Sequence, residues 1–229
     1  MGNRCALVVG ATGLVGGHVV QELAHPSGPP GSEHDRIVVL VRRPSGGAFT
    51  GKADVDEKVV DFDRLDRADF EGIDDVFACL GTTIKVAGSQ EAFRKVDHDY
   101  TVKVAELAKA AGATRFALVS SVGADAGSRN FYLRTKGETE RDVEAIGFST
   151  LIVARPSVLV GTRHESRPGE KIGIAVGRAV SFAMIGGLAK YRPIEARVVA
   201  RAMITAIAEG TAGKRVLLHD DLVELAAAS

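Results

Sequence analysis

Tyr132 and Lys136 are two side chains whose types and spacing could carry out proton transfer. They lie four positions apart in a segment with helical periodicity, so both share one face of the predicted helix. A lysine ammonium beside a phenol favours the tyrosinate, which suits a general acid or base that interconverts a carbonyl and an alcohol. This spacing is common by chance, and an exposed helix pair is the alternative. The hydroxyls of Ser120 and Ser121, just after a predicted strand, favour the catalytic interpretation.

A glycine-rich turn predicts a binding site for the phosphates of a dinucleotide. Gly10, Gly13 and Gly16 separate an apolar run at Cys5–Val9 from an amphipathic segment that begins at Leu14. In such a unit the first glycine allows a tight turn, the second lets a pyrophosphate approach the backbone, and the third lets the helix pack closely. The helix N-terminus adds amide donors and the positive end of its dipole. The flanking strand and helix favour this interpretation over ordinary turn glycines.

Arg42 and Arg43 predict which dinucleotide binds. They directly follow the second apolar run, Arg36–Val41, where domains that prefer NAD carry an acidic residue for the ribose 2′-hydroxyl. Two guanidinium groups at this place suit the 2′-phosphate of NADP(H) instead. The alternative is a solvated pair of surface arginines.

The order of the predicted elements indicates a doubly wound α/β fold, with a Rossmann-like parallel sheet and its ligand at the carboxyl ends of the strands. We expect a single domain over residues 1–229, with a small substrate-covering lobe at residues 157–195. Strand-like runs, most of them short and apolar as is typical of strands buried on both faces, lie at Cys5–Val9, Arg36–Val41, Val55–Val60, Asp75–Leu80, Arg115–Val119, Ser149–Ala154 and Lys214–Leu218. Helical periodicity occurs at Leu14–Ala24, Gln90–Ala111, Asn130–Ile146, Ile172–Phe182 and Val198–Glu209.

The composition excludes several classes of protein. The chain has 229 residues, and its 29 basic and 29 acidic side chains balance, which argues against a protein built to bind nucleic acid or an anionic membrane. Cys5 and Cys79 are too few for a disulfide framework, so we expect a reducing, cytoplasmic location. We find no targeting or membrane-spanning segment, and the six histidines show no paired spacing that predicts a metal site.

Taken together, these motifs resemble the short-chain dehydrogenases/reductases of the atypical type. The resemblance is closest to the NADP(H)-binding subgroup named for the human Tat-interacting protein, and it extends from Gly10 to about Ala208. Besides the glycine turn, it rests on the segments Cys79–Thr83, Val96–Tyr100, Ser120–Asp125, Tyr132–Glu138, Arg155–Pro156 and Glu165–Glu170.

The resemblance implies a role for each matching position. Ser121, which directly precedes Val122 and Gly123, matches the serine that orients the substrate carbonyl, with Ser120 as the alternative. Tyr132 would donate the proton, while Lys136 would bind the nicotinamide ribose and tune Tyr132. Further residues would line the NADP(H) site: Thr12, Gly13, Leu14 and Val15 at the phosphates, Arg42 with Arg43 at the 2′-phosphate, Asp61 and Phe62 at the adenine, Leu80 and Gly81 at the middle, and Leu159 and Arg167 at the far end.

Other candidate residues favour structural interpretations. We expect Asp97, His98 and Asp99 to form a satisfied surface or interface cluster rather than a catalytic dyad. Arg155 should anchor the sheet edge through hydrogen bonds, and Cys79 should fill the core within a buried strand.

Two classes of function remain open from the sequence. The first is an NADP(H)-dependent oxidoreductase that acts on a small molecule of unknown identity. The second is an NADP(H)-binding regulatory or protein-interaction module with little turnover, because a fold does not dictate a function. Epimerase-type chemistry through a transient keto intermediate is a further enzymatic alternative.

Overall fold

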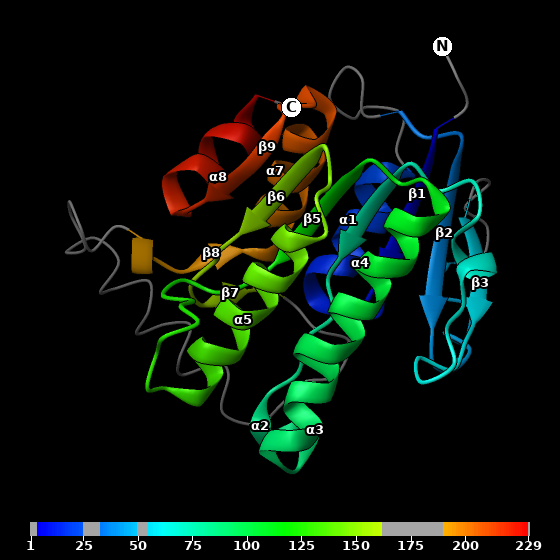
Figure 1. Ribbon diagram of the computed structural model, residues 1–229. Helices are drawn as coiled ribbons and strands as arrows, with labels where there is room; N and C mark the ends of the chain where they lie inside the picture. Colours follow the sequence, from blue (N-terminus) through cyan, green and yellow to red (C-terminus); the bar gives the residue numbers. More distant parts are fainter. Residues whose placement is uncertain (1–3, 25–32, 50–54, 162–189, 229) are drawn as a thin grey trace.

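A seven-stranded parallel sheet forms the centre of the protein (Figure 1). The computed structural model describes residues 4–24, 33–49, 55–161 and 190–228. The strands lie in the order β3-β2-β1-β4-β5-β6-β9, and every pairing in this sheet is parallel. The Rossmann-like α/β prediction is therefore confirmed. The strands are β1 Cys5–Val9, β2 Arg36–Val41, β3 Val55–Val59, β4 Asp75–Ala78, β5 Arg115–Val119, β6 Thr150–Ala154 and β9 Gly213–Leu217.

Helices cover both faces of this sheet. The side chains of α1, α7 and α8 pack on one face, and those of α4 and α5 pack on the other. The helices are α1 Leu14–Leu23, α2 Ile84–Ala87, α3 Gln90–Arg94, α4 Tyr100–Ala111, α5 Phe131–Ala145, α7 Ala196–Glu209 and α8 His219–Ala227, with a short 3₁₀ helix at Arg67–Phe70.

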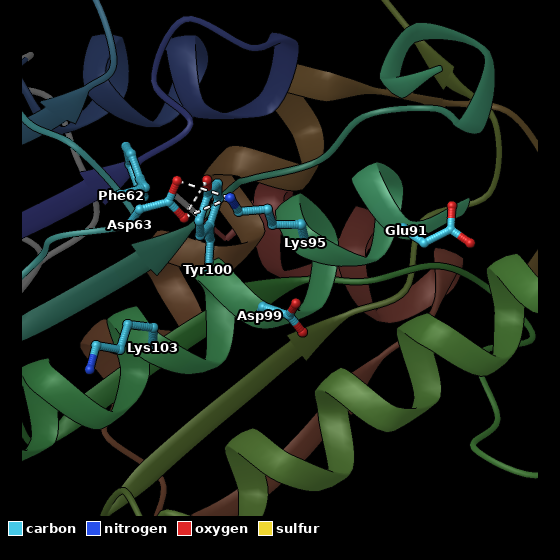
Figure 2. A pocket seen from close by; sticks show the side chains of 7 residues that line it. All are labelled: Phe62, Asp63, Glu91, Lys95, Asp99, Tyr100 and Lys103. Atoms are coloured by element: carbon cyan, nitrogen blue, oxygen red, sulfur yellow. Dashed lines mark hydrogen bonds and ion pairs between the residues drawn. The ribbon is translucent and has the colours of Figure 1, made fainter. Parts of the chain in front are cut away.

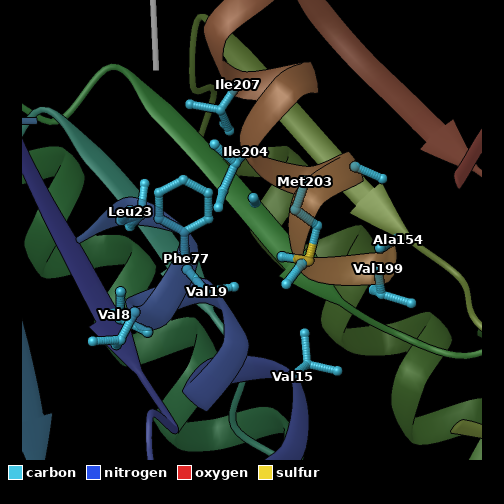
Figure 3. Close-up of a cluster of buried hydrophobic side chains, with 14 of the residues drawn as sticks. Val8, Val15, Val19, Leu23, Phe77, Ala154, Val199, Met203, Ile204 and Ile207 are labelled. Carbon is cyan, nitrogen blue, oxygen red and sulfur yellow. The ribbon is translucent and has the colours of Figure 1, made fainter. Parts of the chain in front are cut away.

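The strands β1, β2, β4, β5 and β6 contribute to two cores because their successive side chains point to opposite faces. On the face covered by α1 and α7, Val8 and Phe77 of the sheet meet Val19 and Met203 of these helices (Figure 3). Leu7, the neighbour of Val8, points into the other core. Both Leu7 and Val8 are fully buried. Because these strands are buried on both faces, their sequences are continuous apolar runs.

The structure departs from the predicted elements in several places. The helix expected over Gln90–Ala111 is interrupted by a π turn at Lys95–Asp99. The Ala-rich end Val223–Ser229 predicts a terminal helix, and the observed helix α8 begins four residues earlier, at His219. A second, two-stranded sheet pairs β7 (Leu159–Val160) with β8 (Ile194–Glu195), and neither strand was predicted.

The position of β1 in the sheet defines the ligand edge. The chain passes from β1 to β2 on one side, and β4 pairs with β1 on the other. In open parallel sheets the crevice at such a switch point, at the carboxyl ends of the strands, is where ligands bind. The residues that follow β1, β2, β3, β4 and β5 lie at this edge and are therefore the candidates for ligand contact.

Candidate functional site

The glycine turn after β1 has the geometry that its spacing predicts. Gly10 has φ +79°, and a Cβ at this position would overlap the backbone of Cys79 at the end of β4. A Cβ on Gly16 would overlap the carbonyl of Gly10, so α1 packs directly on the turn. The amide of Gly13 donates to the carbonyl oxygen of Gly10 at 2.9 Å. The first and third glycines are thus required by close backbone approach.

The first turn of α1 fits an anionic group. Gly13 occupies the N-cap position and supplies no side-chain cap, so first-turn amides remain available to an anion. Thr12 and Gly13 are exposed, and Leu14 is half-buried. Val15 and Gly16 are buried, and Val15 packs in the core. Val15 can therefore reach a cofactor only through its backbone.

Arg42 and Arg43 lie next to this turn. The register pairs Val9 of β1 with Leu40 of β2, which places Val41 level with Gly10 and the two arginines just beyond it. Both arginines are exposed, and within the described ranges no carboxylate lies within ion-pair distance of either guanidinium. Two uncompensated cations next to an open helix N-terminus fit a phosphate group.

Asp61 and Phe62 follow β3 at the same edge of the sheet. Asp61 is exposed, whereas Phe62 is buried and packs on Tyr100 with ring centroids 5.4 Å apart. Tyr100 also donates to Asp63, and Lys95 lies 2.8 Å from the same carboxylate. The hydrogen bond from Lys95 lowers the pKa of Asp63 below its ordinary value.

A shallow pocket of about 460 Å³ lies beside this loop (Figure 2). It is lined by side chains of mixed charge around the Phe62–Tyr100 pair: Phe62, Asp63, Glu91, Lys95, Asp99, Tyr100 and Lys103. The ring of Phe62 is already covered by Tyr100. Of the two residues expected at the adenine, Asp61 is therefore the one with an exposed side chain.

Leu80 and Gly81 continue the crevice after β4. Gly81 is exposed and Leu80 is half-buried against the core. Cys79 follows the last residue of β4 rather than lying within a strand, and its amide donates to Val9 at 2.9 Å. Cys79 is half-buried and packs against the core, which agrees with its interpretation as core filler. Burial raises the pKa of its thiol to about 12.

Tyr132 and Lys136 lie on α5, which begins where the side chain of Asn130 caps the amide of Leu133 at 3.2 Å. Tyr132 is half-buried and packs on Phe93 with ring centroids 5.6 Å apart. Lys136 is 5% exposed. A buried lysine requires a partner for its charge.

The partner of Lys136 is Asp97, whose Oδ1 lies 2.7 Å from Nζ. Asp97 is 1% exposed and His98 is 9% exposed. The interpretation of this segment as a surface cluster was therefore wrong for both residues. The cause is the π turn Lys95–Asp99, which inserts an extra residue into one helical turn and changes which positions face the core. Such turns are frequent at functional sites.

Ser120 and Ser121, which follow β5, have different environments. Ser120 is buried, and its Oγ donates to Glu140 of α5. The guanidinium of Arg155 binds the same carboxylate through Nε at 2.9 Å and through Nη2. Arg155 thus anchors the sheet edge, as expected. Ser121 is half-buried, and its Oγ lies 3.4 Å from the Val122 carbonyl, so this hydroxyl is the more available of the two.

Gly137 was not among the predicted site residues. A Cβ on Gly137 would overlap the backbone of Asp125 and Ala126, so the loop after Ser121 lies directly on α5. This contact fixes the loop beside the helix that carries Tyr132. A glycine inside an amphipathic helix is the sequence signal that could have pointed to it.

The remaining predicted residues lie at or beyond β7. Leu159 belongs to β7 and packs against the core that contains Leu14. A Cβ on Gly161 would lie 2.9 Å from Cδ1 of Leu14, so β7 brings the chain back to the glycine turn. Arg167, the segment Ile172–Phe182 and most of the lobe expected at residues 157–195 lie outside the described residues.

The parts of the chain that the structure describes hold no group of three or more His, Cys, Asp or Glu side chains suited to a metal ion. Within the same parts, no helix is both long and apolar enough to cross a membrane.

Comparison with known proteins identifies the class of this chain. Residues 10–209 match the family described as NAD(P)H-binding, and the chain belongs to that family. The resemblance found from the motifs is thereby confirmed. The chain is 35% identical to Protein HTATIP2 of Rattus norvegicus, over 97% of this chain and 89% of that protein. It is 34% identical to Protein FMP52, mitochondrial, of Candida albicans, over 96% of both chains.

Solved structures share the fold. A putative NAD-dependent epimerase/dehydratase from Bacillus halodurans superposes with a TM-score of 0.69 at 22% identity, covering 98% of this chain and 99% of that one. DesIV, a dTDP-glucose 4,6-dehydratase from Streptomyces venezuelae with NAD and TYD bound, superposes with a TM-score of 0.71 at 16% identity, covering 97% and 80%. At these identities the likeness is one of fold.

The expected cytoplasmic location is contradicted by the relatives. Those from Debaryomyces hansenii, Emericella nidulans, Eremothecium gossypii and Candida albicans are all named mitochondrial proteins. The low cysteine count argues against a disulfide framework, but it does not distinguish among compartments in which thiols stay reduced.

Proposed function

We propose that this protein is an NADP(H)-dependent oxidoreductase of the atypical short-chain dehydrogenase/reductase type, acting on the carbonyl or alcohol of a small molecule. The observation that carries the proposal is the exposed, uncompensated pair Arg42 and Arg43 beside the open N-terminus of α1. An acidic residue at this strand end would favour NAD, whereas arginine accommodates a 2′-phosphate. The family membership supports a pyridine nucleotide and leaves its 2′-phosphate to be tested.

The bound nicotinamide would supply or accept a hydride. The hydroxyl of Tyr132 donates the proton to the carbonyl oxygen in the reductive direction and takes it back in the oxidative one. The Oγ of Ser121 donates a hydrogen bond to the same oxygen and orients it. The ammonium of Lys136 binds the nicotinamide ribose hydroxyls.

The cofactor part of the proposal is tested by changing both arginines to alanine, as Arg42→Ala with Arg43→Ala. A hydrogen bond to a charged phosphate contributes about 1.5–3 kcal/mol, so the preference for NADPH over NADH should fall about tenfold to hundredfold. Isothermal titration calorimetry with both nucleotides measures this ratio. Arg36→Ala, at the opposite end of β2 and paired with Asp56, is the matched control and should leave it unchanged. An unchanged ratio in the double variant would remove the pair from the site.

The catalytic part is tested by Tyr132→Phe, which keeps the ring that packs on Phe93 and removes the hydroxyl. NADPH affinity should be retained, while carbonyl reduction in a panel of aldehydes and ketones should fall at least about a hundredfold, the range of general acid catalysis. Tyr100→Phe is the control. Full activity in Tyr132→Phe would mean that another group supplies the proton. A wild-type protein that binds NADPH and reduces nothing would instead favour the regulatory alternative.

A further inference from the structure

The carboxylate of Asp97 joins two walls of the crevice. Its Oδ1 lies 2.7 Å from Nζ of Lys136 on α5, and its Oδ2 accepts a hydrogen bond from the amide of Thr82 at 2.9 Å. Thr82 directly follows Gly81, and a Cβ on Gly81 would lie 3.7 Å from Oδ1. One buried carboxylate thus contacts both the expected ribose-binding lysine and the peptide that follows β4.

The π turn that carries Asp97 is itself tied to α5. His98 lies 2.9 Å from Asp142 of α5 through Nε2, and 2.7 Å from Asp99 through Nδ1. The hydroxyl of Thr139, also on α5, donates to the backbone carbonyl of Asp97 at 3.2 Å. These contacts hold the backbone of Asp97 and the next residue, His98, against α5, so the position of the Asp97 carboxylate relative to Lys136 is set by the folded chain before any nucleotide binds.

The buried positive charge of Lys136 gives the Asp97 carboxylate a role beyond packing. The side chain of Lys136 is 7% exposed, and a buried ammonium needs a carboxylate or several acceptors in place of water. An ammonium has three N–H donors, and the ion pair with Asp97 fixes the position of the ammonium while leaving donors for a ligand. The ion pair at Oδ1 does not have the geometry of an aligned hydrogen bond, so this oxygen also retains acceptor capacity.

We propose that Asp97 is a positioning residue for the nicotinamide-ribose end of the site. Its carboxylate orients the ammonium of Lys136 toward the ribose hydroxyls and holds the peptide Leu80–Thr82 beside that ammonium. Both groups then contact the nucleotide as one unit. Asp97 acts through Lys136 and does not touch the reacting atoms. The inference rests on the proposed function, since it assumes that a pyridine nucleotide occupies the crevice.

The test compares two nucleotides that differ at this end of the site. Adenosine 2′,5′-bisphosphate has the adenosine half of NADPH and lacks the nicotinamide ribose. In Asp97→Asn we expect the affinity for NADPH to fall about tenfold or more, as for loss of a hydrogen bond to a charged group, and the affinity for the bisphosphate to stay within about twofold. Asp75→Asn, which removes a buried carboxylate at the opposite edge of the sheet, should leave the ratio of the two affinities unchanged. An equal loss for both nucleotides, or no loss for either, would overturn the proposal.

A second pair of variants shows whether Asp97 acts through Lys136. If it does, the double variant Asp97→Asn with Lys136→Met should bind NADPH no more weakly than Lys136→Met alone. This comparison also applies if Asp97→Asn does not fold, because the double variant leaves no unpaired buried charge. Additive losses in the double variant would contradict a role through Lys136.

A measurement without nucleotide separates this inference from the proposed function. In the free protein, the paired and buried Lys136 should react slowly with an amine-acetylating reagent, and mass spectrometry should show faster acetylation of Lys136 in Asp97→Asn. An unchanged rate would refute the role of Asp97 even if NADPH binds. Failure of the wild-type protein to bind any pyridine nucleotide would instead refute the proposed function, and the inference with it, whatever the acetylation rate.

Discussion

The strands of the central sheet begin at its amino edge and end at its carboxyl edge, and a buried carboxylate lies at each. The two carboxylates differ in how many partners they contact. At the amino edge, Asp75 opens β4 and is fully buried. It accepts hydrogen bonds from the guanidinium groups of Arg4 and Arg115, and its Oδ2 lies 2.7 Å from Nε2 of His34. At the carboxyl edge, Asp97 contacts one ammonium and one amide.

Other polar groups show the same contrast, because those at the carboxyl edge lack partners that those at the amino edge have. At the carboxyl edge, Arg42 and Arg43 are exposed without a carboxylate partner in the described ranges, and the N-terminus of α1 has no side-chain cap. At the amino edge, Asp74 accepts from the amide of Cys5 at 2.8 Å, in addition to the bonds of Asp75. We infer that the amino edge stabilises the fold, whereas the carboxyl edge retains polar groups for a ligand, as expected for an open parallel sheet.

The largest effect that we expect is a loss of stability in Asp75→Asn. Removing one partner of a buried ion pair costs about 3–5 kcal/mol, and we expect the lower end because Arg4 and Arg115 are partly exposed. Urea denaturation measures the change in the free energy of unfolding. The control is Asp56→Asn at the exposed pair with Arg36, which should change stability by less than about 0.5 kcal/mol.

NADPH binding by Asp75→Asn tests whether the amino edge contributes to ligand binding. If the amino edge serves only the fold, folded Asp75→Asn should bind NADPH with the wild-type affinity, as measured by calorimetry well below its unfolding temperature. A variant of normal stability with weakened nucleotide binding would show that the two edges do not divide the roles in this way.

The sheet and its helices were predictable from the sequence because their signals are local. Cys5–Val9 and Arg36–Val41 were predicted with the observed bounds, since burial on both faces requires an unbroken apolar run. The glycine turn was predictable because Gly10 and Gly16 are each required by backbone contacts that no other residue permits. The residues that follow each strand were then expected at one edge from topology alone.

The partners within the site were not predictable because they depend on contacts between distant segments. Asp97 and Lys136 lie 39 positions apart, and the π turn that joins them breaks the 3.6-residue period on which the helix prediction rested. Glu140 was likewise missed, although it fixes Ser120 and Arg155. It lies four positions after Lys136 on α5, so the face of the helix that we propose to be catalytic continues into one that holds the structure.

The smallest expected effect is a pH dependence at the amino edge. Burial alone would raise the pKa of Asp75, but the hydrogen bond from His34 and the charges of Arg4 and Arg115 lower it below its ordinary value. A carboxyl whose pKa is lower in the folded state adds stability above its unfolded pKa of about 3.9, and this contribution disappears as the pH falls towards the folded value. The difference in unfolding free energy between wild type and Asp75→Asn should therefore stay constant from pH 7 to about pH 5 and shrink below about pH 4. Urea titrations at a series of pH values measure it, and subtracting the variant cancels the acidic groups that the two proteins share. A difference that persists undiminished at pH 3 would mean that the fold does not lower the pKa of Asp75, and the contrast between the two edges would then no longer rest on a satisfied carboxylate.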